Sequence, residues 1–184
     1  VIFDFKPIRP SIVKKMSVIC GADTETLHGY ARLFTFDDKD HKKILFELNT
    51  REDVTRLLRW LTEHKSGRII YFFNMDYDIR ALIKWLPRQS IIEMAGFDET
   101  SYDRYTFKYI EGKMFEITDN ERRRKVRMFD LWQFYNSSLE NAAKRYLDGQ
   151  EKRKDLLEEA GINIQNLTEK DLKHYQFRQY AVED

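Results

Sequence analysis

Apolar runs alternate along the chain with amphipathic segments, and this alternation predicts a layered sheet. The short apolar run 18–22 is typical of a buried strand. Alternating aromatic and polar positions over 29–36 and an apolar stretch at 44–48 predict two further strands. Because short polar turns join the three strands, we expect them to form an antiparallel meander.

A helix and a central strand are predicted next. Thr50 is a suitable N-cap and Gly67 a suitable end for a helix whose apolar residues lie on one stripe. The stripe consists of Val54, Leu57, Leu58 and Leu61. The unbroken apolar run 69–73 has the length of a strand covered on both faces. This order of elements favours an α/β sheet over a helical bundle or a sandwich.

The middle of the chain is predicted to return to β structure. A helix over 79–85 is expected to end before Pro87, and 91–135 is expected to be mainly strands. Glu111-Gly112 is a turn signal for a β-hairpin. The strands expected in this part are 105–110, 113–118 and 126–132. The basic run 122–125 could hold phosphates, but a charge run this short is more often simply solvated.

The last third is predicted to be helical. Ser137 or Ser138 is expected to cap a helix that continues to Leu147, and 150–159 is expected to form a second helix. Thr168 is expected to start the last helix. The residues of the first of these helices expected to face inward are Leu139, Ala142, Ala143 and Tyr146.

Composition limits the possible functions. The 184 residues, 42% of them hydrophobic, fit a single domain over 1–184, with 1–16 as an entry segment. A net charge of +1 gives no bulk electrostatic argument for nucleic-acid binding. The single cysteine, Cys20, excludes an internal disulfide and is typical of a reducing compartment. Because no apolar run approaches the roughly 18–20 residues of a membrane span, we expect an intracellular protein with no membrane partner.

Two carboxylates follow the first predicted strand. Asp23 and Glu25 point the same way, because side chains alternate between the faces of a strand. Adjacent carboxylates repel each other and favour a cation between them, and such oxygen ligands suit Mg²⁺ or Mn²⁺. Asp and Glu together number 31 of 184 residues, so the pair alone is more often a solvated strand end than a metal site.

Further polar residues occur at matching places later in the chain. Asn74 and Asp78 follow the strand 69–73, where α/β sheets place their sites. The structural alternative to a site is that Asn74 is a turn residue and that Asp78 is a helix cap. Tyr180 and Asp184 stand one helical turn apart on the last predicted helix. Each pattern is weak alone, so the inference depends on the ordered set.

The ordered set resembles the proofreading 3′–5′ exonuclease domain of family B DNA polymerases. Residues 23–25 are similar to its first motif, 74–78 to its second and 180–184 to its third. The compact spacing is more similar to the protein-primed branch of viruses and mobile elements, and Ser138-Leu139 is similar to a small motif of that branch near the DNA. The resemblance covers about 18–184. It implies an α/β fold of ribonuclease H type, with a mixed sheet flanked by helices and an inserted β-hairpin.

The resemblance also implies a reaction and a site. It implies hydrolysis of the 3′-terminal phosphodiester of single-stranded DNA with two divalent ions, Mg²⁺ or Mn²⁺. The metal ligands that it implies are Asp23, Glu25, Asp78 and Asp184. Tyr180 is expected to orient the attacking water through its hydroxyl. The residues expected to hold the 3′ end of the strand are Thr26, Asn74, Tyr77, Ser138 and Leu139.

Two departures from the family pattern leave alternatives open. The branch has a functional lysine followed two residues later by an aromatic, and neither Lys152 nor Lys154 has this aromatic. The polymerase motifs are absent, and a metal ligand such as Asp184 rarely stands at a fraying end, so we expect a polymerase domain further along the same chain. The alternatives are a free-standing exonuclease similar to ribonuclease D, a catalytically silent domain that binds single strands or a replication partner, and an unrelated α/β domain.

Overall fold

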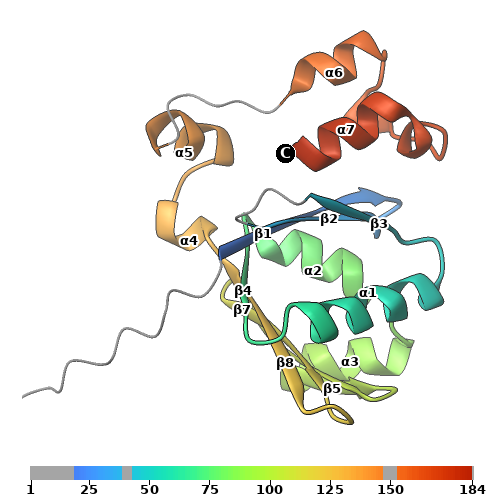
Figure 1. Cartoon of the computed structure of the whole chain (residues 1–184), viewed down its shortest axis with the longest axis vertical. Helices are drawn as coiled ribbons and strands as arrows, with labels where there is room; N and C mark the ends of the chain where they lie inside the picture. The colour runs from blue at the N-terminus through green and yellow to red at the C-terminus, as the bar shows by residue number, and fades with distance from the viewer. Residues whose placement is uncertain (1–18, 39–42, 147–152, 184) are drawn as a thin grey trace, which may run out of the picture.

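A mixed sheet of eight strands runs through the molecule, which the computed structural model describes for residues 19–38, 43–146 and 153–183 (Figure 1). The strands are β1 (Ile19–Leu27), β2 (Tyr30–Asp38), β3 (Ile44–Glu47), β4 (Ile69–Phe72), β5 (Glu99–Tyr102), β6 (Tyr105–Ile110), β7 (Met114–Asp119) and β8 (Arg124–Asp130). Their order across the sheet is β3-β2-β1-β4-β8-β7-β6-β5. The expected entry segment 1–16, Lys152 and Asp184 lie outside the described residues.

The pairing of β1 determines where the sheet can hold a site. β1 pairs antiparallel with β2 and parallel with β4, and β4 pairs parallel with β8. β1 pairs with β4 only through residues 19–21 and continues to Leu27, so Asp23 within β1 comes level with the carboxyl ends of β4 and β8, where α/β proteins place their sites. β5, β6 and β7 are inserted between β4 and β8 and extend the sheet beyond β8, with β6 and β7 forming the predicted hairpin. The expected α/β fold of ribonuclease H type is confirmed.

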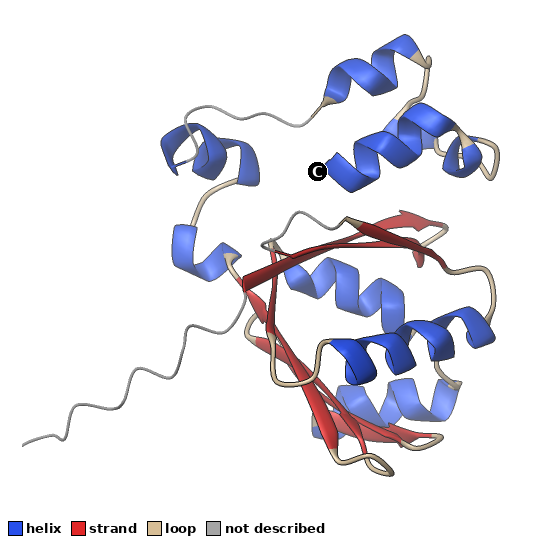
Figure 2. Cartoon of the chain, in the orientation of Figure 1, coloured by secondary structure: helices blue, strands red, loops and turns tan. Residues whose placement is uncertain are grey.

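Helices cover both faces of the part of the sheet formed by β1 and β2 (Figure 2). The helices are α1 (Arg51–His64), α2 (Met75–Ile83), α3 (Arg88–Phe97), α4 (Trp132–Tyr135), α5 (Leu139–Tyr146), α6 (Lys154–Glu159) and α7 (Tyr175–Glu183). α2 contacts β1 and β2 from one side, and α7 contacts the same strands from the other. Among the described residues, no helix has the length and apolar character needed to cross a membrane.

The alternation of side chains along β2 produces a separate hydrophobic core on each face. Phe34 packs in the larger cluster with α1 residues such as Leu57. Leu33 points the other way and packs in a smaller cluster with Phe177 and Tyr180 of α7. A strand buried on both faces can hold α7, and hence Tyr180, firmly against the sheet.

The predicted first helix is confirmed in detail. Thr50 and Asp53 form a capping box, in which each side chain bonds to the backbone of the other residue. The predicted stripe is buried throughout: Val54, Leu57, Leu58 and Leu61. α1 ends just before Gly67, whose positive φ of 76° is a conformation that glycine adopts readily.

The expectation that 91–135 is mainly β structure was wrong at both ends. Residues 88–97 form α3 and residues 132–135 form α4. Pro87 stands immediately before α3 with φ of −55°, close to the helical value, and so leads directly into a helix. Only Ser90 and Met94 of α3 are buried, and this spacing of one helical turn is too sparse to stand out in the sequence.

Three expectations for the last third also need correction. Of the α5 residues expected to face inward only Ala142 is fully buried, and Tyr146 is largely exposed because the short helix packs loosely. Of the helix expected over 150–159, residues 154–159 form α6 and Arg153 precedes it as the N-cap, while residues 150–152 lie outside the described residues. The last α-helix begins at Tyr175 rather than Thr168, which instead bonds to Asp171 and opens a short 3₁₀ turn.

Candidate active site

Three of the four predicted carboxylates gather with the predicted tyrosine where β1, α2 and α7 meet. Asp23 and Glu25 lie on β1, on the same face as Leu27, which packs in one cluster with Tyr180 of α7. Asp78 comes from the first turn of α2, on the other side of β1. The fourth predicted ligand, Asp184, lies outside the described residues.

Asp78 is a buried carboxylate that is held by the first motif. Its side chain is only 4% exposed. Its Oδ1 accepts hydrogen bonds from the backbone nitrogen of Thr24 at 3.0 Å and from the Thr24 hydroxyl at 2.6 Å. Because Thr24 stands between Asp23 and Glu25, these bonds tie α2 to the centre of the acidic pair. The bonds to a residue of β1 exclude the alternative that Asp78 serves only to cap its own helix.

The electrostatics of Asp78 are those of an acid without a matching cation nearby. Burial raises its pKa, and the negative charge of Asp23 raises it further, to about 7. The two hydrogen bonds from Thr24 act in the opposite direction but do not compensate. A divalent cation between Asp23 and Asp78 would remove this repulsion. The arrangement therefore favours binding of a cation.

Tyr180 completes the described part of the site. Its side chain is 4% exposed, and burial together with the charges of Glu25 and Asp23 raises the pKa of its phenol. The hydroxyl therefore keeps its proton at neutral pH. It can donate a hydrogen bond to a water molecule or a phosphate oxygen, as the sequence predicts, but it cannot act as an anionic base.

Asn74 is placed by an aspartate that the sequence analysis did not single out. Asn74 has a left-handed backbone with φ of 64°, so the turn alternative is correct for its main chain. Its backbone nitrogen donates to Asp130 Oδ1 at 3.0 Å, and the nitrogen of Trp132 donates to the same oxygen at 2.8 Å. Asp130 ends β8, beside β4, and an acid within the apolar second half of the predicted strand 126–132 is the signal that could have found it.

A cleft of about 860 Å³ opens beside the carboxylates. Four predicted site residues line it: Asp23, Asn74, Ser138 and Leu139. Ser138 also caps α5 as expected, since its Oγ accepts from the backbone nitrogen of Asn141 at 3.2 Å. The aromatic side chains on its wall include Trp132, Tyr135 and Tyr146. Residues from β1, β4, α4, α5 and α7 thus surround one space.

Thr26 and Tyr77, also predicted to hold the strand, lie outside the described lining of this cleft. Their hydroxyl oxygens are 2.7 Å apart and hydrogen-bonded. The Tyr77 ring is 60% exposed and is free to pack against a ligand. The ammonium of Lys154 lies 3.9 Å from Glu140 Oε2 on α5.

The donor set fits a hard cation, although the described residues do not by themselves form a complete centre. Within residues 19–38, 43–146 and 153–183, no three His, Cys, Asp or Glu side chains are grouped tightly enough to hold a metal ion. Asp23, Glu25 and Asp78 offer only carboxylate oxygens, which Mg²⁺ and Mn²⁺ prefer. With Asp184 as the further predicted ligand, the residues fit the expected ions.

No protein-family model matches the chain, and neither a curated protein nor a solved structure matches it significantly. The arguments for a function therefore come from the motifs in the sequence and from the geometry of the site. The strongest of these is the link from Asp78 through Thr24 to the acidic pair, because it joins two motifs that lie far apart in the sequence.

Proposed function

We propose that this chain is a metal-dependent 3′–5′ exonuclease that removes terminal nucleotides from single-stranded DNA, as the proofreading domain of a family B DNA polymerase. The observation that supports this most is the position of Asp78. It is buried, bonded to Thr24, and has a pKa raised to about 7 by burial and by Asp23. Perturbed carboxylates at the carboxyl end of central strands are typical of active sites.

Each residue has a role in the proposed reaction. Asp23, Glu25, Asp78 and Asp184 would hold two divalent ions, which supply an activated water and charge neutralisation at the phosphate. Tyr180 donates its hydroxyl proton in a hydrogen bond that orients the water. Thr24 holds Asp78 in place and does not touch the substrate.

The aromatic cleft suits an unpaired strand. Bases stack on exposed aromatic rings with little regard to sequence, and Trp132 and Tyr146 are both exposed on its wall. Asn74, Ser138 and Leu139 line the same cleft and would contact the sugar–phosphate backbone of the strand. A paired end would have to melt before its terminal phosphodiester reached Asp23.

The test is cleavage of 5′-labelled single-stranded DNA with Mg²⁺ or Mn²⁺, beside an EDTA control. We expect a ladder that shortens from the 3′ end, is absent with EDTA and is absent for Asp23→Ala. Glu99→Ala is the matched control, because it removes an exposed carboxylate from β5. The same assay with an RNA strand distinguishes the proposed DNA exonuclease from the alternative, an exonuclease similar to ribonuclease D. A folded protein that binds DNA but leaves it intact would contradict the proposal.

A further inference from the structure

A second, smaller hollow lies at the other end of β1 from the cleft. It has a volume of about 380 Å³ and is formed by the β1–β2 turn, the start of α1 and the end of α2. Its walls include two aromatic side chains, Tyr30 and Trp85, and the cationic side chains Arg32, Arg51 and Lys84. We call it the Tyr30–Trp85 pocket. Neither the sequence motifs nor the proposed function assigns it a role.

Two of these cations are not neutralised by a neighbour. Arg32 is paired with Glu169. Among the described residues, neither Arg51 nor Lys84 forms an ion pair with an acidic side chain. Arg51 is also the first residue of α1, where the helix dipole disfavours a positive charge. The positive charge of Arg51 therefore does not contribute to the stability of α1 itself.

The walls of the pocket are fixed by hydrogen bonds. Trp85 Nε1 donates to the Ala31 carbonyl at 2.8 Å, and Arg51 Nε donates to the Trp85 carbonyl at 2.9 Å. The two terminal nitrogens of Arg51 therefore remain for a bidentate contact with an anion. The ring of Tyr30 meets that of Trp85 edge-on at 5.1 Å and is 40% exposed, which leaves a surface for a flat ligand.

Gly29 leaves room for the ammonium group of Lys84, the second of these cations. Its φ is +75°, and a Cβ at this position would collide with Lys84 Nζ. The turn between β1 and β2 therefore accommodates the ammonium group beside the ring of Tyr30, 5.8 Å from its centroid. Lys84 also suits the end of α2, so the argument for an anion depends mainly on Arg51.

We propose that the Tyr30–Trp85 pocket binds a nucleoside monophosphate, with the phosphate on Arg51 and Lys84 and the base against the aromatic rings. Its volume is near the lower end of the range for ligand pockets, roughly 300–1,000 Å³, which suits one nucleotide. Leu27, on its wall, follows Asp23 at a distance of about 13 Å along the strand. The choice of a nucleotide rests on the proposed function, since hydrolysis at Asp23 would release nucleotides within reach of the pocket.

Binding of dAMP in EDTA, measured by calorimetry, tests the pocket without any cleavage. We expect Arg51→Gln to weaken dAMP binding at least tenfold and Lys84→Gln to weaken it less. Arg59→Gln, an exposed position on the same helix, is the matched control and should bind like the unchanged protein. Thermal unfolding of each variant checks that it is folded. No binding, or equal binding by Arg51→Gln and Arg59→Gln, would overturn the proposal.

Two further arms identify the ligand and separate this proposal from the exonuclease function. If Arg51→Gln weakens dAMP binding but not binding of a single-stranded oligonucleotide, the pocket holds the free nucleotide. If the variant weakens binding of both ligands equally, the pocket holds a nucleotide that is part of the bound strand. Tyr30→Ala should weaken dAMP binding and leave binding of inorganic phosphate unchanged. Pocket-dependent dAMP binding by a protein that does not cleave DNA would support the pocket while contradicting the proposed function.

Discussion

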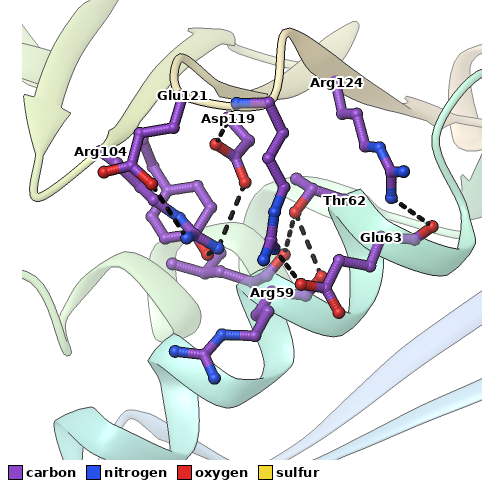
Figure 3. A network of polar contacts seen from close by, with 10 residues as sticks. Arg59, Thr62, Glu63, Arg104, Asp119, Glu121 and Arg124 are labelled. Carbon is purple, nitrogen blue, oxygen red and sulfur yellow. Dashed lines mark hydrogen bonds and ion pairs between the residues drawn. The ribbon is translucent and has the colours of Figure 1, made fainter.

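Asp78 and Asp119 are the two most deeply buried acids among the described residues, and they have opposite surroundings. Asp119, at the end of β7, lies 3.2 Å from the guanidinium of Arg104 and accepts a hydrogen bond from the backbone of Arg122 (Figure 3). The contact of Asp119 Oδ2 with Arg104 is an ion pair rather than a well-aligned hydrogen bond. Asp78 has Thr24 and a second carboxylate, Asp23, as its neighbours.

The network around Asp119 joins the inserted hairpin to α1. Arg104 also contacts Glu121 at 3.2 Å, Arg122 pairs with Glu63, and Arg124 donates to the Glu63 carbonyl at 3.1 Å (Figure 3). Arg122 and Arg124 of the basic run 122–125 are thus occupied with contacts inside the protein, which favours the interpretation that the run is not a phosphate site.

The difference shows how to distinguish a structural acid from a functional one. Asp119 has its counter-charge supplied by the protein, and a buried acid of this kind holds elements together. Asp78 has its charge opposed by Asp23, so the fold maintains a repulsion that an external cation can relieve. Each prediction below sets one side of this comparison against the other.

Asp23→Ala should have the largest effect on activity and should not reduce stability. Cleavage is expected to fall about a thousandfold or more, because the proposed metal site would lose one of its carboxylate ligands. The melting temperature should stay the same or rise, because the repulsion with Asp78 is relieved. A single-turnover cleavage assay and a thermal melt measure the two quantities. An unfolded variant would instead assign Asp23 a structural role.

Asp119→Ala should show the reverse pattern. Arg104 would keep a charge that is only 15% exposed and would lose its buried partner, at a cost of about 3 kcal/mol in the free energy of unfolding. Urea denaturation measures this loss, and cleavage per folded molecule should be unchanged. Glu121→Ala, which removes an exposed partner of the same arginine, should cost less than about 1 kcal/mol. Equal losses in the two variants would contradict the distinction.

The pH dependence of stability should identify Asp78. Its pKa rises from 3.8 in the unfolded chain to about 7 in the folded protein, so folding favours the protonated form. The resulting stability is fully present below pH 4 and is lost as the pH rises through 7, by up to about 4 kcal/mol. Asp78→Asn keeps an acceptor for Thr24 and should flatten this part of the curve. Chemical denaturation without metal measures the free energy of unfolding between pH 5 and pH 8. If its slope against pH is the same in Asp78→Asn as in the unchanged protein, the prediction is contradicted.

Tyr180→Phe should have the smallest effect. The ions keep their ligands, so cleavage is expected to fall only about ten- to a hundredfold through loss of the orienting hydrogen bond. Stability should hardly change, since the ring still packs with Phe177. Cleavage rates of this variant and of Asp23→Ala are compared in one assay. Equal losses would show that the tyrosine does more than orient water.

Local patterns predicted much of the framework. The stripe of α1 and the turn at Glu111-Gly112 are where the sequence placed them, because each depends on spacing within a few residues. Asp23 and Glu25 were expected to follow the first strand, but β1 continues to Leu27, so both carboxylates lie within it. Asp78 could be recognised as a candidate because it follows a central strand, and its approach to the acidic pair was implied only by the resemblance of the motifs.

Other features depend on contacts that no local pattern records. Asp130 holds Asn74 because β8 pairs with β4 although a whole insertion separates them in the sequence. The bond of Thr24 to Asp78 has the same non-local origin. α3 was missed because only Ser90 and Met94 face the core. That Arg51 has no acidic partner in the part of the chain that the structure describes could not be recognised, since the sequence does not show which acids lie near it.

Binding of Mn²⁺ is the measurement that tests the comparison between the two buried acids most directly. Calorimetric titrations at pH 7.5 would compare the unchanged protein, Asp78→Asn and Asp119→Asn. The account predicts saturable binding to the unchanged protein and to folded Asp119→Asn, with at least tenfold weaker binding to Asp78→Asn. Equal affinity in all three proteins, or no binding by the unchanged protein, would contradict the assignment of Asp78 to a metal site.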